Sequence, residues 1–480
     1  MRRTVTAVIV GLALLGGYGA ADVLDVAPGI FTLEPEPAAY PVPSATPSPS
    51  ARLPLPSPAP SGMPVTPAGA SAPLPSASGL RTALAPALAD ADLKGAAVVI
   101  RDALTGAHLV DIAADDPRVP ASTVKIITAL AVQASFPPAS TLTTRVVQGD
   151  TPDSVVIVAG GDMFLAPDKG DPAAVVGRAG LGELADAVVG SLRARGVSAV
   201  TVRVDDSYAP GAQEATGWPA SFRATGVVGP VAMLGLATQW AQDGRRGPAD
   251  PVAEVAATFA ARLSERGVVA KVGAPPTKVR GSASGSASGP GPAELGAIHS
   301  APVADLMGLA LELSDNTLSE SLARQAAFRA GRPSDFEGTA AYLQEVLASR
   351  GIDTRGVSLH DASGLSRTNV LPARVLADVL DLAAVGTQPA FSAIIRALPV
   401  AGLTGTLQER FRDAPDAAAA GLVRAKTGTL TGVNALAGTV VTAEGRLLVF
   451  AVLQQGSVGT TDARAALDRF GATLAACGCR

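Results

Sequence analysis

In the region from residue 80 to the C-terminus, apolar and polar positions alternate near both ends, as they do in β-strands. GAAVVIRDALTGAHLVDIAADD (95–116) alternates on either side of Thr105-Gly106, which predicts a β-hairpin. Near the C-terminus, LVRAKTGTL (422–430), VNALAGTVVT (433–442) and RLLVFAVLQQ (446–455) predict three further strands. The last two are joined by a short turn, and a final helix is expected after them, from about Thr460 to Ala476.

Between these ends, the pattern changes twice. DSVVIVAGGD (153–162) reads as a buried strand, 182–196 as a helix with a glycine stop, and 199–207 as a second strand, which together suggest an α/β unit. From residue 293 to about Leu398 the spacing is mainly helical. We therefore expect an α/β (α+β) fold, in which both chain ends build one antiparallel sheet with helices on its faces. The α/β unit is then an insertion.

Two segments have a composition unlike that of a folded domain. Residues 22–78 are rich in Pro, Ala and Ser, which predicts an extended stalk or, alternatively, a Pro-rich ligand for another domain. Residues 281–292 (GSASGSASGPGP) are expected to form a flexible linker. The predicted catalytic domain is thus divided into 79–144 and 293–480 by an inserted domain at 145–280 and this linker.

The first 21 residues carry Arg2 and Arg3, followed by an uncharged stretch that runs to Ala21. This length suits either a cleaved signal peptide or an uncleaved membrane anchor, and the sequence leaves both open. With the arginines in the cytoplasm, both alternatives place the remaining chain outside the cytoplasmic membrane, in the cell envelope or secreted.

Composition and charge exclude several classes of protein. The 480 residues are 48% hydrophobic and 17% charged, as in a globular protein, and the net charge of −4 gives no indication of a nucleic-acid partner. The only two cysteines, Cys477 and Cys479, cannot build a disulfide framework or a four-cysteine zinc site. Either a small ring closed by a disulfide or a free thiol pair is compatible with their spacing.

Three short motifs carry the candidate chemistry. They are Ser122-Thr123-Val124-Lys125 at the start of an apolar helix, Ser314-Asp315-Asn316 before a second helix, and Lys426-Thr427-Gly428-Thr429 on a strand. Each has an ordinary structural interpretation when taken alone: a capped surface helix, a helix N-cap and a solvated turn. Two of the chain's six lysines nevertheless fall in these motifs, and the motifs follow the order that one catalytic mechanism needs.

The first motif supplies a nucleophile and its base. A serine hydroxyl is a weak nucleophile until a neighbouring base takes its proton, and Lys125 lies one helical turn from Ser122. We expect burial and a nearby cation, Lys426, to lower the pKa of Lys125 so that it can accept that proton. The backbone N–H of Ser122 and one from the strand of the third motif are expected to form an oxyanion hole.

The other two motifs are expected to handle the proton and the substrate. Ser314 can relay the proton to the leaving amine, and Asn316 can hold a substrate amide. Lys426, Thr427 and Thr429 can bind a substrate carboxylate, while Gly428 lies between them on a strand edge to which a peptide could add.

These motifs resemble those of the penicillin-recognising serine enzymes, and most closely the class C low-molecular-mass penicillin-binding proteins, the D-alanyl-D-alanine carboxypeptidase/endopeptidase family. The resemblance covers roughly residues 80 to 480, and the 189 residues between Lys125 and Ser314 match the family's inserted domain. Gly160-Gly161-Asp162 and the segment 361–369 (DASGLSRTN) are also similar to family patterns, although Met163 stands where the family usually has proline.

The resemblance implies a DD-peptidase/β-lactamase-like fold and a two-step acyl transfer without metal or cofactor. Ser122 would attack the bond between two D-alanines of a peptidoglycan stem peptide, and β-lactams would acylate it as substrate mimics. A serine β-lactamase, a DD-transpeptidase and a catalytically idle wall-binding protein are the alternatives. A Ser-His-Asp hydrolase is disfavoured because we find no G-x-S-x-G elbow.

Overall fold

The computed structural model describes residues 71–479 except 138, 243, 275–291, 386–388 and 457–458. The described residues form one compact unit. The expected signal or anchor (1–21), the stalk up to residue 70 and the linker up to residue 291 lie outside the described residues. Within the described ranges, none of the helices has the length and apolar character needed to cross a membrane.

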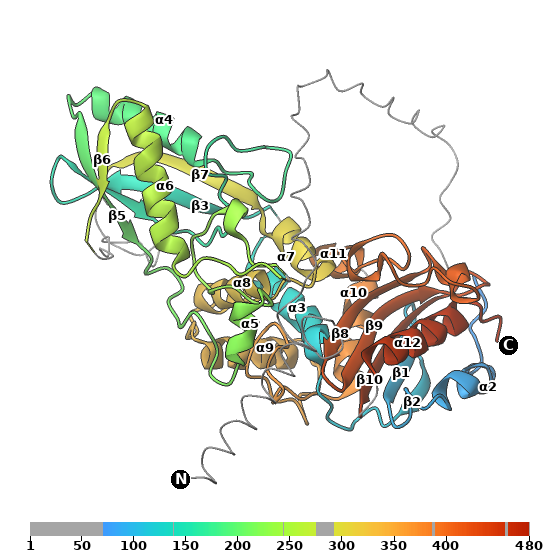
Figure 1. Cartoon of the computed structure of the whole chain (residues 1–480). Helices are drawn as coiled ribbons and strands as arrows, with labels where there is room; N and C mark the ends of the chain where they lie inside the picture. The colour runs from blue at the N-terminus through green and yellow to red at the C-terminus, as the bar shows by residue number, and fades with distance from the viewer. Residues whose placement is uncertain are drawn as a thin grey trace, which may run out of the picture. The chain divides into compact units, whose positions relative to one another are not determined.

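The first sheet is antiparallel throughout and is built from both ends of the folded chain, which confirms the expectation from the sequence (Figure 1). Its order is β2-β1-β10-β9-β8, so β8 is an edge strand. A two-residue turn, Thr431-Gly432, joins β8 to β9, and Gly432 has a positive φ of +71°, which glycine adopts without strain. The strands are β1 (Ala97–Asp102), β2 (His108–Ile112), β8 (Val423–Leu430), β9 (Val433–Val441) and β10 (Leu447–Gln455).

Helices cover both faces of this sheet, because its strands are buried on both sides and read as near-continuous apolar runs. On one face, α12 (Thr460–Ala475) and α2 (Ala77–Leu88) share an apolar core with the sheet, in which Phe450 of β10 packs against Phe470 of α12. The core on the other face contains α3 (Lys125–Ser135) and α10 (Ala373–Ala384).

The central helix of the second core is α3. Every residue from Lys125 to Gln133 is buried, as expected for a helix that is apolar all round. The helices that share this core with α3 and α10 are α7 (Val303–Glu312), α8 (Asn316–Arg329), α9 (Phe336–Ser349) and α11 (Pro389–Arg396).

A second, mixed sheet has the order β6-β5-β4-β3-β7. Strands β4 and β5 are parallel and connected through α4, which confirms the predicted strand–helix–strand unit. The sequence pattern missed β7, because the residues after 292 were expected to be helical. By sheet membership, the unit therefore extends beyond 145–280 on both sides. Its elements are β3 (Thr141–Gln148), β4 (Ser154–Val158), α4 (Leu181–Arg193), β5 (Ala199–Asp205), α6 (Pro251–Glu265), β6 (Val269–Val272) and β7 (Glu294–Pro302).

A long connection between β5 and α6 carries only short helices, α5 (Ala220–Ala224) and the 3₁₀ turn η2 (Ala237–Gln239). Two further 3₁₀ turns, η3 (Gly405–Leu407) and η4 (Asp416–Ala419), precede β8. Helix α6 begins where Asp250 caps the N–H groups of Val252 and Ala253 and Pro251 occupies the first helical position.

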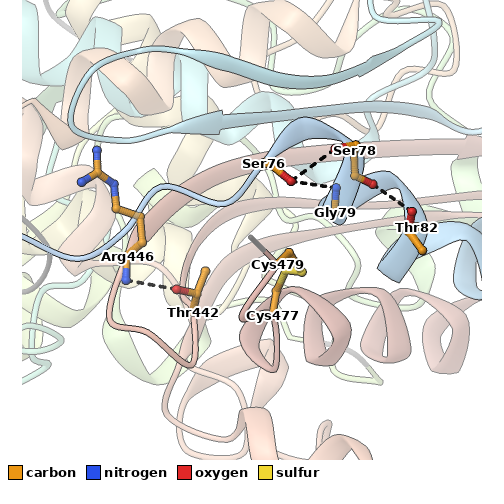
Figure 2. Close-up of a disulfide and its surroundings, with 8 residues drawn as sticks. All are labelled: Ser76, Ser78, Gly79, Thr82, Thr442, Arg446, Cys477 and Cys479. Atoms are coloured by element: carbon orange, nitrogen blue, oxygen red, sulfur yellow. Dashed lines mark hydrogen bonds between the residues drawn. A yellow bond between two sulfur atoms is a disulfide. The ribbon is translucent and has the colours of Figure 1, made fainter.

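At the C-terminus, Cys477 and Cys479 form a disulfide, which decides between the two alternatives that the sequence left open (Figure 2). The carbonyl oxygen of Cys479 accepts a hydrogen bond of 2.7 Å from the backbone N–H of Ser76. The hydroxyl of Ser76 in turn caps α2 by accepting from the N–H of Gly79 at 3.0 Å (Figure 2). The two ends of the described chain are thus joined beside α2.

Candidate active site

Ser122 lies in a short 3₁₀ turn, η1 (Ala121–Val124), and the α-helix proper begins at Lys125. The Lys125 side chain has an exposed fraction of 0%. Its Nζ donates hydrogen bonds to Ser122 Oγ at 2.9 Å, to Asn316 Oδ1 at 2.7 Å and to the backbone oxygen of Ser363 at 2.6 Å. The lysine therefore does not point at water, as it would on a surface helix.

The three contacts of Lys125 are not equivalent. An amide oxygen and a backbone carbonyl can only accept hydrogen bonds, whereas a serine hydroxyl can also donate. When the amine is neutral, its two N–H groups can stay with Asn316 and Ser363, and its lone pair then faces the Ser122 hydroxyl. The arrangement can therefore reverse the direction of the Ser122 contact alone, as a general base requires.

Burial lowers the pKa of Lys125 to about 8, and the carboxyls of Asp361, Glu320 and Asp315 oppose this shift. The direction agrees with the sequence-based expectation, but the cause is only partly the expected one. Complete removal of the ammonium from water outweighs the surrounding negative charge, and no cation is needed to lower this pKa.

The second motif begins the helix α8. The Asp315 carboxylate caps this helix by accepting from the N–H of Leu318 at 2.6 Å, so the ordinary N-cap interpretation is also correct. Asn316 Nδ2 donates to the backbone oxygen of Val227 at 2.7 Å, which leaves Oδ1 to face Lys125. Ser314 adopts a left-handed conformation with φ of +58°, a strained state of the kind found at functional sites.

Sequence reasoning missed the residues that hold the third acceptor of Lys125. The buried carboxyl of Glu320 accepts from the N–H groups of Ala362 and Ser363 at 3.0 and 2.7 Å. Burial, followed by the charge of Asp361, raises the pKa of Glu320 to about 8. Helix α8 (NTLSESLARQAAFR) is rich in polar residues, so nothing in the sequence marked Glu320 for this role.

Asp361 organises the segment 361–369, whose pattern was noted in the sequence. Its carboxylate accepts from the N–H of Gly364 at 2.8 Å, from that of Ser366 and from the side-chain amide of Asn369 at 2.7 Å. The indole N–H of Trp218, from the connection before α6, donates to the same carboxylate at 2.9 Å. This segment is thereby fixed against the turn that carries Ser122.

The third motif lies on the edge strand β8. Lys426 is fully buried, and this burial, together with the charge of Lys125, places its pKa well below the usual value. Its Nζ donates to the backbone oxygen of Thr427 at 3.1 Å, and the Thr427 hydroxyl lies 2.9 Å from that of Thr406. A side chain at Gly428 would approach the carbonyl oxygen of Pro120 to 2.7 Å, so glycine lets β8 pack closely against η1.

A cavity of about 870 Å³ opens at these elements, and Ser122, Ser314, Asn316 and Thr429 all line it. The structure thus brings residues of all three motifs to one cavity, with Lys125 and Lys426 buried beneath it. Among the residues described, no group of three or more His, Cys, Asp or Glu side chains is placed to hold a metal ion.

The Gly160-Gly161-Asp162 pattern lies away from the reacting groups. A side chain at Gly160 would overlap the carbonyl oxygen of Thr143, and Gly161 has a positive φ of +99°. The buried Asp162 carboxylate accepts from the N–H of Phe164 at 2.8 Å. The pattern therefore shapes a turn at the end of β4.

A helix-flanked antiparallel sheet, with the cavity-lining Ser122 bonded to the buried Lys125 beside its edge strand, is the arrangement expected of a serine-type D-Ala-D-Ala carboxypeptidase. Comparison with known proteins agrees with this class. The chain belongs to the D-Ala-D-Ala carboxypeptidase 3 (S13) family, whose sequence profile matches residues 80–244 and 237–476.

Two curated relatives cover most of the chain. Carboxypeptidase DacB of Mycolicibacterium smegmatis is 38% identical over 99% of this chain and 98% of its own length. Carboxypeptidase Rv3627c of Mycobacterium tuberculosis is 35% identical over 86% of this chain and 87% of its own. Among solved structures, penicillin binding protein 4 from Haemophilus influenzae shares the fold with a TM-score of 0.63 at 20% identity, covering 83% of this chain and 98% of that one.

Proposed function

We propose that the enzyme removes the terminal D-alanine from peptidoglycan stem peptides through an acyl-enzyme on Ser122. The observation that carries this proposal is the buried Lys125 ammonium, hydrogen-bonded to Ser122 Oγ at 2.9 Å and to two groups that only accept. A base held in this way has one partner from which it can take a proton, and that partner is the serine.

In the first step, Ser122 Oγ attacks the carbonyl carbon of the penultimate D-alanine while its proton passes to neutral Lys125. Backbone N–H groups of Ser122 and of the β8 edge stabilise the oxyanion. The C–N bond then breaks, and Ser314 relays the proton from Lys125 to the leaving nitrogen, which departs as the amine of free D-alanine. An ester between Ser122 and the shortened peptide is left.

In the second step, water attacks this ester, Lys125 accepts the proton of the water, and Ser122 regains it as the acid product leaves. Asn316 holds a substrate amide as well as the lysine. Lys426, Thr427, Gly428 and Thr429 bind the peptide along β8, which is an edge strand and can therefore pair with an extended substrate. Neither step needs a cofactor.

β-Lactams are expected to acylate Ser122 and to leave slowly as inhibitors. The related fold of penicillin binding protein 4 from Haemophilus influenzae has been solved in complex with a β-lactam, at a TM-score of 0.57 and 21% identity. Cell-wall substrates also require the enzyme to act outside the cytoplasmic membrane. Whether residues 1–21 are cleaved or anchor the chain stays a prediction from the sequence.

Two experiments test this proposal. A labelled penicillin should acylate the wild-type enzyme but not the Ser122→Ala variant, and labelling of that variant would disprove the assignment of the nucleophile. Incubation with diacetyl-Lys-D-Ala-D-Ala should release free D-alanine. Hydrolysis of penicillin at a high rate without release of D-alanine would favour a β-lactamase, transfer of the acyl group to an added amine a transpeptidase, and cleavage of cross-linked dimers an endopeptidase.

A further inference from the structure

Three charged side chains line the active-site cavity: Asp315, Arg367 and Arg464. The Asp315 carboxylate is engaged by the N–H of Leu318 and by the indole N–H of Trp240. Arg367 Nη1 donates to the backbone oxygen of Thr431 at 2.9 Å. Neither arginine takes part in the proposed acyl transfer. The two guanidinium groups therefore give the cavity positive charge that the bond-breaking steps do not need.

Of the two arginines, Arg464 makes fewer interactions through its guanidinium. It is exposed on the second turn of α12, and among the described residues no carboxylate lies within ion-pair distance of its guanidinium and no acceptor receives a hydrogen bond from it. The acid about one helical turn after Arg464, Asp468, accepts hydrogen bonds of 2.6 and 2.9 Å from Arg410. Arg410 also donates to the backbone oxygen of Arg464 at 3.1 Å, which fixes the start of α12 against the segment after η3.

A second observation concerns the polar groups at the same end of β8. Thr429, which lines the cavity, pairs across the sheet with Asn434 of β9, and Asn434 pairs with Gln454 of β10. Directly paired residues point to the same face, and here that face is the one covered by α12. The amide nitrogen and oxygen of Asn434 and Oε1 of Gln454 are buried without a hydrogen-bond partner among the described residues.

Burying an amide group without a hydrogen-bond partner costs free energy. The amides of Asn434 and Gln454 therefore favour a nearby polar partner, such as water or a polar group of the substrate. Elsewhere on the same face most of the side chains are apolar, such as Leu436 and Phe450, and the buried carboxylate of Asp102 is paired with Arg446. The polar row therefore begins where the cavity and the start of α12 meet, beside Thr429.

The third observation is that Lys426 is poorly suited to neutralise a substrate carboxylate. It is fully buried and donates to the backbone of Thr427, and its pKa lies well below the usual value for a lysine. A guanidinium stays charged under all ordinary conditions and binds a carboxylate through two parallel hydrogen bonds. Arg464 can therefore supply a permanent charge beside the third motif.

We propose that Arg464 recognises the free α-carboxylate of the substrate's terminal residue, beside the Thr429 hydroxyl, and so determines specificity for a chain end. This inference rests on the proposed function, because the peptide must lie along β8 with its scissile carbonyl at Ser122. The carboxylate is then one Cα beyond the scissile nitrogen, towards the Thr429 end of the cavity. Arg464 acts on substrate selection and has no part in the proton transfers.

The test compares diacetyl-Lys-D-Ala-D-Ala with the same peptide carrying a C-terminal amide, using the full chain. For Arg464→Gln we expect kcat/KM for the free acid to fall by about 10- to 100-fold, mainly through KM, since a charge-assisted pair is lost. The kcat/KM for the amide should stay within about twofold of the wild-type value. Arg464→Lys, which keeps the charge without the fork, should be intermediate.

Arg469→Gln is the matched control, because it removes the same charge from the same helix at a residue paired with Asp90 and outside the cavity lining. Arg469→Gln should leave kcat/KM unchanged for both the free acid and the amide. If Arg464→Gln lowers kcat/KM equally for the acid and the amide, or for neither, the inference is overturned. The proposed function would still stand as long as the wild type releases D-alanine. Failure of the wild type to cleave either peptide would overturn both. If a thermal melt shows that Arg464→Gln is unstable, the acid and the amide are compared in Arg464→Lys instead, once its own melt confirms that it is folded.

Discussion

The ammonium nitrogen of Lys125 lies 2.6 Å from the backbone oxygen of Ser363, which belongs to a segment remote in sequence from all three motifs. This contact occupies one N–H of the lysine and directs the remaining lone pair of the neutral amine towards Ser122. The position of the base is therefore set from two sides, by its own helix and by the segment 361–369.

The pH dependence of acylation should report the protonation of Lys125. Because burial lowers its pKa to about 8, the base is protonated and inactive below that pH and free above it. The second-order rate constant for acylation by penicillin should therefore rise roughly tenfold per pH unit up to about pH 8 and then level off. Stopped-flow or quenched labelling between pH 5.5 and 9.5 measures this curve, and a flat profile across the range would contradict the role of Lys125.

Glycine at position 364 should be essential for the geometry of Ser122. Gly364 has a φ of +87°, and a side chain there would come within 2.0 Å of the carbonyl oxygen of Ala121. We expect Gly364→Ala to displace the backbone of η1, to lower the rate of penicillin acylation by at least about tenfold and to destabilise the fold by more than the ~1–2 kcal/mol of left-handed strain alone.

The matched control for that variant is Gly351→Ala. Gly351 has a similar φ of +74°, but a side chain there meets nothing within 4 Å. It should show only the strain of about 1–2 kcal/mol, with normal acylation of the folded protein. Denaturant unfolding and labelling stoichiometry measure both effects, and equal acylation by the two variants would argue against the proposed coupling of Gly364 to Ser122.

The buried Glu320 should make stability depend on pH. Burial raises its pKa from 4.5 to about 8, so between these values the folded protein binds the proton more tightly than the unfolded chain. This contribution is complete below about pH 4.5 and is lost as the pH rises through 8. Relative to Glu320→Gln, which keeps an acceptor and cannot ionise, the wild type should lose about 2–4 kcal/mol between pH 5 and pH 8.5.

Glu320→Ala separates this effect from the hydrogen bonds. It leaves the N–H groups of Ala362 and Ser363 without their acceptor, so we expect a loss of about 2–5 kcal/mol at every pH. Guanidinium unfolding at several pH values measures all three proteins. Parallel pH curves for wild type and Glu320→Gln would show that the carboxyl does not titrate in this range.

The C-terminal disulfide should contribute to stability only modestly and not to catalysis. Cys477 and Cys479 are two residues apart, so their bond restricts the unfolded chain little, by about 1–2 kcal/mol. The pair packs with α2 and α12 on the face of the sheet opposite α3. The double variant Cys477→Ser/Cys479→Ser should melt slightly earlier and label with penicillin at the wild-type rate, and a slower rate would indicate an unrecognised connection to the site.

Much of the fold followed from local patterns, because strand alternation and turn glycines depend on residues close in sequence. The hairpin at 95–116, the strands of the third motif, the β4–α4–β5 unit and the final helix were all predicted. Strand β7 was missed because it pairs with β3 across more than a hundred residues, and its mixed apolar pattern (ELGAIHSAP) gives no clear period.

By itself, the sequence determined the three motifs, their order and the antiparallel sheet, since these depend on residue type, spacing and local periodicity. Tertiary structure alone decided how Lys125 is buried, which groups it contacts and why its pKa falls. It also decided that Glu320, Asp361 and Ser363 support the site, and that Arg464 faces the cavity. These properties arise from segments that meet only after folding, where burial and hydrogen bonding change the chemistry of a side chain without any mark in the local sequence.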